Sequence, residues 1–338
     1  MNENDAIIVM SHGAGGTLSA RLIESEFLPR YGNEILRRLG DGAVLPPLRG
    51  SPVMTTDAYV IRPHFFPGGD IGSLAVHGTV NDLLMCGAEP RGLSLAFILE
   101  EGFPLADLKR IVLSMAAAAR EAGVPVVTGD TKVVERGKGD GVFITTTGIG
   151  VVPPGVDISG DRARPGDRII VSGTIGDHGV AIMSSRENLS FETTIESDTA
   201  ALHGLVAAMI GAVPGIHCLR DPTRGGVATT LNEIATQSGC GMMLREVALP
   251  IRPQVNAACE FLGLDPLYVA NEGKLLAICA ERDAGRLLAT MRAHPLGCDA
   301  GIIGEVIADP HHFVQMETAF GGRRIVDWLT GEQLPRIC

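Results

Sequence analysis

The sequence predicts an α+β protein of two domains. Two long stretches each mix β-branched strand patterns with amphipathic helix patterns. A segment rich in proline, glycine and aspartate, residues 152–166, separates them as a linker would. With 338 residues, of which 45% are hydrophobic, the chain is long enough for two packed cores. We therefore expect domains over 1–155 and 165–310, followed by a separate segment, 311–338.

The first half is expected to begin and end with strands. The expected strands are 53–60, 91–99, 124–127 and 142–149, and the expected helices are 72–86 and 105–122. The second helix presents Leu108, Ile111 and Met115 on one face, and Gly123 is its expected C-terminal cap. The turn before the second strand is expected at residues 88–90.

The second half repeats the mixture of strands and helices without a strict sequence repeat. The expected strands are 168–171, 274–280 and, as the last, 302–307, and the expected helices are 199–210, 227–237 and 283–293. Beyond them the sequence predicts one amphipathic turn, 325–329, and a flexible tail. The last sixteen or so residues could span about 50 Å when extended.

Composition excludes several classes of protein. The net charge is −11 and no basic stripe is present, so we expect no nucleic-acid partner. No apolar run reaches the ~20 residues that span a bilayer, and the polar start, residues 1–5, does not resemble an export signal. We therefore expect no membrane association and a cytoplasmic location.

The seven cysteines do not have the spacing of a disulfide framework or a zinc site. Most of them lie in apolar stretches, as expected for small buried hydrophobic residues. Cys338 is different because it is the last residue of the sequence.

A glycine loop, His12-Gly13-Ala14-Gly15-Gly16-Thr17, precedes the first domain core. Its free N–H groups could cover phosphates, although a plain surface turn is an equally good interpretation. Gly225-Gly226 precedes a helix and offers a second set of open N–H groups, for which helix capping is a comparable explanation.

Aspartates lie at strand ends and helix starts in four places, namely Asp57, Asp82, Asp130 and Asp221. Any one of them could be a cap or a turn former. Asp82 is the exception, because it lies in an apolar context where an unpaired carboxylate is costly. If they cluster, such carboxylates bind Mg²⁺ and a nucleoside triphosphate. Glu272, beside a glycine turn, is either a general base or a solvated turn residue.

These motifs, in this order, resemble the PurM-type ATP-binding superfamily, which includes aminoimidazole ribonucleotide synthase, selenophosphate synthase, thiamin monophosphate kinase and the HypE proteins. The resemblance covers nearly the whole chain. Within the superfamily, one group of motifs resembles the HypE carbamoyl dehydratases of hydrogenase maturation. It comprises His12–Gly16, Asn81–Ala88, Gly129–Val134, Asp221–Gly226 and, above all, Pro335-Arg336-Ile337-Cys338.

The resemblance implies a PurM-like fold with two AIR-synthase-like domains, in which the N-terminal strands of two copies form a shared barrel in a homodimer. It implies ATP and Mg²⁺ as cofactors, with ATP at or near the subunit interface. The implied metal ligands are Asp57, Asp82 and Asp221. The implied nucleotide-binding residues are His12, Gly13, Gly15, Gly16, Asn81, Asp130 and Gly225, with Lys132 near the nucleotide.

The resemblance also implies a reaction. A HypF-type carbamoyltransferase loads Cys338, and the enzyme then uses ATP to dehydrate the S-carboxamide to a thiocyanate. The cyanide passes to a HypC–HypD-type complex and becomes a ligand of the iron in [NiFe] hydrogenase. Lys132 would offset phosphoryl charge, and Glu272, with or without Lys132, would be the base. The α-carboxylate of Cys338 is expected to raise the thiol pKa and Arg336 to lower it.

Two other functions fit the residues. One is a PurM-type ATP-dependent kinase or synthetase that acts on a small molecule, for which Cys338 is incidental. The other is a non-catalytic carrier, which binds ATP as a structural ligand and presents Cys338 to partner proteins.

Overall fold

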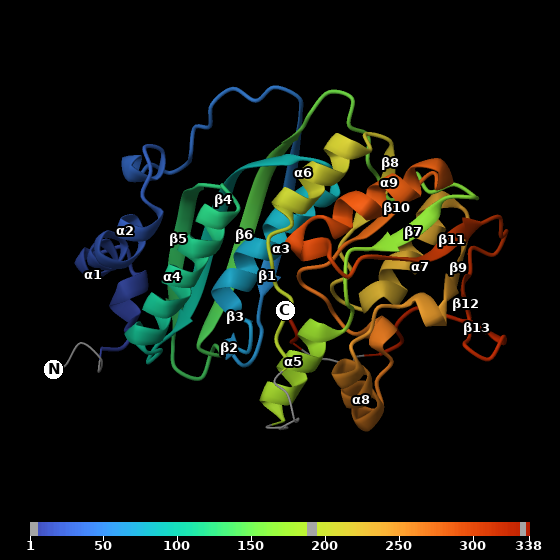
Figure 1. Ribbon diagram of the computed structural model, residues 1–338. Coiled ribbons are helices and arrows are strands. Elements are labelled where there is room, and N and C mark those ends of the chain that lie inside the picture. The colour runs from blue at the N-terminus through green and yellow to red at the C-terminus, as the bar shows by residue number, and fades with distance from the viewer. Residues whose placement is uncertain (1–5, 188–194, 332–335) are drawn as a thin grey trace.

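Two β-sheets, each packed against helices, organise the chain into an N-terminal and a C-terminal half (Figure 1). The computed structural model describes residues 6–187, 195–331 and 336–338. Both halves are mixtures of strands and helices, as the sequence predicts, and the end of the chain lies between them (Figure 1).

The first sheet has four strands in the order β1-β6-β4-β5. They are β1 (Ser51–Tyr59), β4 (Glu89–Glu100), β5 (Val126–Val134) and β6 (Val142–Val152). β4 and β5 are parallel, because helix α4 (Leu105–Glu121) connects them, whereas the other pairs are antiparallel. Helices α3 (Ile71–Met85) and α4 cover one face of this sheet, and within the described residues its other face carries no helix (Figure 1).

Helix α3 is buried on nearly every side. It packs on β1 and β6 with one face and on α4, α6 (His203–Ala212) and β8 (Ile216–Arg220) with others. Asp70 caps its start by accepting hydrogen bonds from the backbone N–H groups of Gly72 and Ser73. This position places Asn81 and Asp82 at the contact between the two halves.

Strand β5 is longer than the sequence indicates, and residues 129–132 lie within it rather than after it. The expected end at residue 127 is therefore wrong. β4 extends for twelve residues and pairs with β5 as far as Glu100 opposite Val134. Gly129 is needed inside the strand, because a Cβ there would lie 2.5 Å from the carbonyl oxygen of Leu95. The expected turn at 88–90 is also wrong, since β4 begins at Glu89.

The second sheet has seven strands in the order β13-β12-β9-β11-β7-β10-β8. Besides β8, they are β7 (Arg168–Val171), β9 (Gly241–Arg245), β10 (Leu276–Cys279), β11 (Gly301–Ile307), β12 (Val314–Glu317) and β13 (Arg323–Ile325). Besides α6, the helices of this half are α5 (Asp177–Arg186), α7 (Gly226–Ser238), α8 (Pro253–Leu262) and α9 (Glu281–Arg292).

Several expectations for the second half are corrected. β11 is not the last strand, because β12 and β13 follow it. Helix α6 begins at His203 rather than 199, because the backbone of Ala200 and Leu202 bonds to the side chain of Asn81 instead. Residues 325–329 form no amphipathic turn, since Ile325 ends β13.

The N-terminal segment packs along the β5 edge of the first sheet (Figure 1). It contains α1 (Thr17–Leu22) and α2 (Leu28–Tyr31), joined by a π-helical turn (Ile23–Phe27). A short hairpin, β2 (Phe65–Phe66) and β3 (Gly69–Asp70), precedes α3.

Residues 336–338, which we call the tail, pack against the protein instead of extending from it. Ile337 is 4% exposed, and the backbone N–H of Val60 donates to an oxygen of the α-carboxylate of Cys338. Residues 1–5 and Pro335 lie outside the described residues. Among the described helices, none has the length and apolar character needed to cross a membrane.

Candidate active site

Most of the residues that the sequence singles out line three pockets. The N-terminal pocket, of about 200 Å³, lies between the N-terminal segment and β5. The carboxylate cleft, of about 830 Å³, lies where β1 and α3 meet the second half. The thiol pocket, of about 370 Å³, contains Cys338 and shares Arg224 with the carboxylate cleft.

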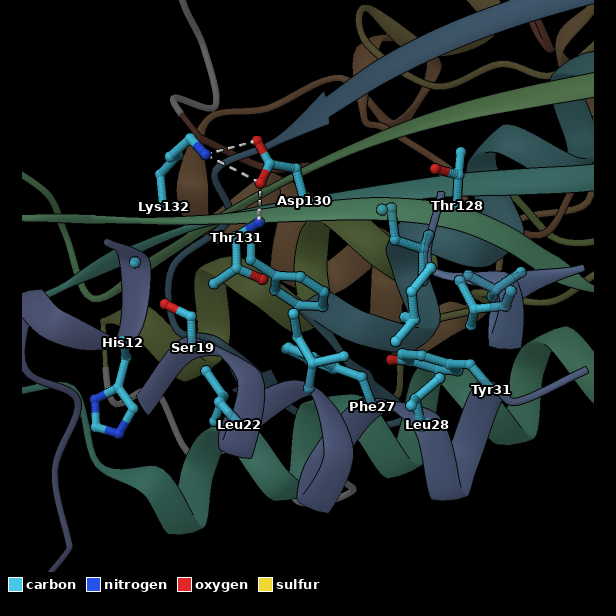
Figure 2. Close-up of a pocket in the computed structure, with 18 of the residues that line it drawn as sticks. His12, Ser19, Leu22, Phe27, Leu28, Tyr31, Thr128, Asp130, Thr131 and Lys132 are labelled. Atoms are coloured by element: carbon cyan, nitrogen blue, oxygen red, sulfur yellow. Dashed lines mark hydrogen bonds and ion pairs between the residues drawn. The ribbon is translucent and has the colours of Figure 1, made fainter. Parts of the chain in front are cut away.

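The N-terminal pocket has an apolar floor and a polar rim. Its floor includes Leu22, Phe27, Tyr31 and Phe97, and Phe27 stacks on both Tyr31 and Phe97. Figure 2 shows Lys132 and Asp130 paired on one side of β5, with Thr131 and the apolar floor on the other side, so the pair lies at the edge of the pocket. Such a site suits a flat apolar ring with phosphates at its rim.

The polar rim consists of one ion pair and the glycine loop. The Nζ atom of Lys132 lies 3.1 Å from the Asp130 carboxylate, and this hydrogen bond lowers the Asp130 pKa. The imidazole of His12 points away from that pair (Figure 2), and its Nδ1 accepts a hydrogen bond from the backbone N–H of Val9. The loop therefore offers backbone, rather than the His12 ring, to a ligand.

Gly13 fits closely against β5. A Cβ on this residue would lie 2.4 Å from the backbone nitrogen of Val133, so only glycine lets the loop lie this close. Gly15 lines the pocket with positive φ, and Gly16 caps α1 beside it in open space.

The carboxylate cleft brings Asp57, Asp82 and Asp221 to one place. Asp57 lies on β1 and accepts hydrogen bonds from the hydroxyls of Tyr59 and Thr79. Asp82 lies on α3 and accepts one from Thr55, at 2.7 Å. The sequence left open whether its aspartates cluster, and these three do.

Burial raises the pKa of Asp82 to about 7, and the neighbouring carboxylates of Asp221 and Asp57 add to the effect. Burial likewise raises the pKa of Asp221 to about 6. Carboxylates that repel one another in this way favour a bound cation. Among the residues that the structure describes, no three His, Cys, Asp or Glu side chains are arranged as a ready metal site.

The thiol pocket places Cys338 among charged groups. Burial raises the pKa of its thiol to about 12, the nearby Glu272 and Asp57 raise it further, and Arg224 opposes them. The expectation that Arg336 lowers this pKa is wrong, because the Arg336 side chain pairs with Asp140 instead. The docked cysteine is therefore a protonated thiol at neutral pH.

Glu272 is buried, so the interpretation as a solvated turn residue is wrong. Its backbone N–H donates to Asp198 at 3.0 Å, whereas its side-chain Oε1 has no hydrogen-bond partner. Burial, with the charges of Asp221, Asp198 and the other cleft carboxylates, raises the Glu272 pKa well above its ordinary value. When this carboxylate is ionised, the raised pKa makes it a stronger base than an ordinary glutamate.

The structure separates some of the residues that the sequence groups together. Asn81 lines neither the N-terminal pocket nor the carboxylate cleft. Its side-chain amide forms hydrogen bonds with the backbone of Ala200, Leu202 and Glu272 and thereby fixes the loop that carries Glu272. Gly225 lies in the thiol pocket with Arg224, as the cap of α7. Lys132 lies in the N-terminal pocket, on the strand farthest from β1.

Sequence reasoning missed three contributors. Arg224 lines two of the pockets, and its place as the one cation in the motif 221–226, three residues after Asp221, was the available signal. Tyr31 gives no signal, although its buried hydroxyl lies in the N-terminal pocket without a partner. His178 gives none either, because its contact with the tail joins residues 159 positions apart.

Comparison with known proteins agrees with this architecture. Residues 39–152 match the model described as AIR synthase related protein, N-terminal domain, and residues 164–317 match the corresponding C-terminal domain. The chain is 67% identical to "Carbamoyl dehydratase HypE" of Cupriavidus necator over 339 residues, which cover 100% of this chain and 97% of that protein. This chain belongs to the HypE carbamoyl dehydratases.

Solved HypE structures have the same fold. A crystal structure of HypE in complex with ATP superposes with a TM-score of 0.95 at 52% identity and covers 98% of this chain and 99% of its own. HypE in a HypE–HypF complex superposes with a TM-score of 0.81 at 49% identity, covering 93% and 100%. The chain is thus an enzyme of the HypE family of hydrogenase maturation proteins, and members of this family have been crystallised with ATP and with HypF.

Proposed function

We propose that this enzyme uses ATP to dehydrate an S-carboxamide on Cys338 to a thiocyanate, which supplies the cyanide ligands for the iron of [NiFe] hydrogenase. The position of Cys338 carries the proposal. Its side chain lies in a pocket that borders the carboxylate cleft, where Glu272 and Arg224 act on its charge. A cysteine that is incidental to catalysis is not expected to be buried at this place.

The chemistry needs two groups at the cysteine. The carboxamide oxygen attacks the γ-phosphorus of ATP, and ADP leaves. A base removes an N–H proton, the C–O bond breaks and phosphate leaves, and loss of the second N–H proton completes the C≡N bond. The products are the thiocyanate, ADP, phosphate and one proton, so the water equivalent ends in the phosphate.

We assign the base to Glu272 and electrostatic assistance to Arg224. The free Oε1 of Glu272 can accept the N–H proton without giving up an existing hydrogen bond. Arg224 lines both the cleft and the thiol pocket, where it can offset negative charge on the phosphoryl group.

For the nucleotide, we propose that the apolar floor of the N-terminal pocket holds the adenine and that its rim contacts the phosphates. Asp57, Asp82 and Asp221 would hold Mg²⁺, which lowers the charge repulsion that a phosphate group meets in this cleft. At the rim we retain the nucleotide-binding role for five residues, namely His12, Gly13, Gly15, Gly16 and Asp130. For Asn81 and Gly225, the contacts support positioning roles: Asn81 fixes the loop that carries Glu272, and Gly225 caps α7 beside the thiol pocket.

We further propose a homodimer formed by the uncovered face of the first sheet, closing the strands of two copies into a barrel. This open face carries Met54, which is 72% exposed, and Ile98, which is 40% exposed. Lys132 also points to this face. Side chains alternate between the two faces of a strand, and Thr131 on β5 points inward, so its neighbours Asp130 and Lys132 both point to the uncovered face. In such a dimer, Lys132 of one copy would serve the Cys338 of the other.

The proposed partners are a HypF-type carbamoyltransferase that loads Cys338 and a HypC–HypD-type complex that accepts the cyanide. The HypE–HypF complex of a relative supports the first of these. We propose the cytoplasm as the compartment, in keeping with seven cysteines that are all free thiols.

Intact-protein mass spectrometry tests the function. The protein is incubated with carbamoyl phosphate, ATP and a HypF-type partner, and then with Mg-ATP alone. We expect a carbamoyl group on Cys338, followed by ATP-dependent loss of one water. Loading without that loss would favour the carrier function, and no loading, together with turnover that survives Cys338→Ser, would favour a small-molecule kinase or synthetase.

A further inference from the structure

Each of the three residues of the tail accepts a hydrogen bond from the folded protein through a backbone oxygen. The guanidinium of Arg186 donates to the carbonyl of Arg336, His178 contacts the carbonyl of Ile337, and the backbone N–H of Val60 donates to an oxygen of the α-carboxylate of Cys338. Arg186 and His178 both belong to α5. The tail therefore lies between this helix and the end of β1, held by its backbone.

His178 is the buried one of these donors. It has no solvent exposure, and its ring packs edge-on against Phe66, with 5.8 Å between the ring centroids. Its Nε2 lies 2.8 Å from the carbonyl oxygen of Ile337, and its Nδ1 lies 2.8 Å from the hydroxyl oxygen of Ser197. Both ring nitrogens are thus in use, and one of them depends on the tail.

The surrounding groups fix the tautomer of this ring. The carbonyl of Ile337 can only accept, so the Nε2 of His178 must carry a proton. The Ser197 hydroxyl accepts from the backbone N–H of Thr199 at 3.2 Å, which leaves its own proton to donate to Nδ1. Burial lowers the His178 pKa, so the ring is neutral and carries its single proton on Nε2. Ser197 therefore orients His178 as a donor aimed at the tail.

We propose that His178 is a positioning residue for the dehydration step: its Nε2–H, oriented by Ser197, holds the carbonyl of Ile337 and thereby keeps the Cys338 side chain beside Glu272. This inference rests on the proposed function, because it assigns a role within that reaction. When the tail leaves for loading, the Nε2–H loses its partner inside the protein, which favours return of the tail.

The geometry suggests a pair of variants that separates positioning from ordinary core packing. The side-chain nitrogen of glutamine can take the place of Nε2, whereas asparagine reaches only the position of Nδ1. His178→Gln therefore retains the donor to Ile337, and His178→Asn retains only the contact with Ser197. Both remove the ring that packs on Phe66, so a purely structural role would affect them alike.

Two measurements on the full chain test the proposal. In the first, protein carbamoylated on Cys338 by the HypF-type partner is mixed with Mg-ATP, and loss of water is followed over a single turnover. We expect His178→Asn to slow this step roughly 10- to 100-fold and His178→Gln to remain within about threefold of wild type. Equal rates in the two variants would overturn the proposal.

The second measurement does not depend on the reaction. The unloaded protein is treated with N-ethylmaleimide, and modification of Cys338 is followed in its own peptide, with the exposed Cys86 and Cys298 as internal references. We expect faster modification of Cys338 in His178→Asn and near wild-type protection in His178→Gln. Unchanged protection in His178→Asn would overturn the positioning role even if wild-type protein dehydrates its carboxamide. Conversely, a wild type that loads but does not dehydrate would contradict the proposed function and leave the protection result to decide the role of His178.

Discussion

Asp57 and Gly129 lie in one row of the first sheet, with Thr146 and Leu95 between them. Three strand spacings separate the two residues, or roughly 14 Å. The carboxylate cleft and the strand that carries Lys132 therefore lie at opposite edges of the same sheet. One copy of the chain holds both halves of the proposed chemistry but does not bring them together, and in the proposed homodimer a second copy would supply Lys132.

This separation predicts complementation between two inactive variants. We expect dehydration to be abolished in homodimers of Cys338→Ala. In homodimers of Lys132→Ala we expect it to fall by about 10²-fold or more. A mixed dimer, purified through two different affinity tags, pairs an intact Lys132 with an intact Cys338 on the other copy. We expect dehydration to recover in the mixed dimer, as measured by mass spectrometry of the Cys338-bearing copy. If the mixed dimer is as inactive as its parents, Lys132 acts within its own copy.

The uncovered sheet face predicts a charge-sensitive dimer. Met54→Asp places a carboxylate at the centre of an interface that would be apolar, so we expect a monomer by light scattering and loss of dehydration. Phe261→Asp on α8 is the matched control, because Phe261 is 73% exposed but lies on the other half of the chain. A Met54→Asp protein that remains dimeric would place the interface elsewhere.

Neighbouring glycines of the nucleotide loop should respond differently to alanine. In Gly13→Ala the new methyl would meet the β5 backbone, so the loop must move away from the pocket rim. We expect calorimetry to show ATP binding weakened by about 10-fold or more. Gly16→Ala has open space around it and an ordinary backbone conformation, so its affinity should remain close to wild type. Equal affinities for the two variants would argue that ATP binds away from this loop.

Local sequence signals were sufficient to predict the helices and strands that bury one regular face. The helix over 105–122 was predicted within a residue, because its apolar residues repeat at helical spacing and Gly123 ends it. Gly129-Asp130 was read as the end of a strand because those residues usually form turns. Only the parallel pairing with β4 shows that the strand continues, and pairing is a property of the tertiary fold.

The site was predictable residue by residue but not as an arrangement. The sequence indicated that carboxylates, a glycine loop and Cys338 act together, and the three cleft aspartates do converge. It could not show that Lys132 lies at the far edge of the sheet, since strand order is not encoded locally. Nor could it show His178 beneath the tail, because a buried histidine is recognisable only by its contacts.

The buried His77 predicts how stability depends on pH. Burial, together with the nearby His203, lowers the His77 pKa from 6.5 to about 4, so the ring is neutral in the folded protein. The unfolded chain binds a proton at His77 below about pH 6.5, and stability is therefore lost as the pH falls from 6.5 towards 4. This group alone contributes up to about 3 kcal/mol to that loss.

His77→Asn should retain the contact with Thr199 and remove the titration. Urea unfolding between pH 8 and pH 5 is therefore expected to show a smaller decline for the variant than for wild type. Parallel curves, with the same difference in unfolding free energy at every pH, would show only the cost of a cavity and would contradict the assignment of this titration to His77. Burial also lowers the pKa of His64 and of His178, but both residues are present in both proteins, so their contribution cancels.

Glu272→Gln tests the base directly. The substitution retains the size of the side chain and removes its ability to take up a proton. We expect loading of Cys338 to be unchanged, because Glu272 has no part in it, and the dehydration of the carboxamide to fall by about 10²- to 10⁴-fold. The thermal midpoint should not decrease, since the variant removes a buried carboxyl group that has an unpartnered oxygen and lies among other carboxylates. A loss of dehydration together with normal loading and an undiminished midpoint would assign the defect to proton transfer. If the variant dehydrates at the wild-type rate, the proton must go elsewhere, and the mixed-dimer experiment then shows whether Lys132 of the second copy is in place to receive it.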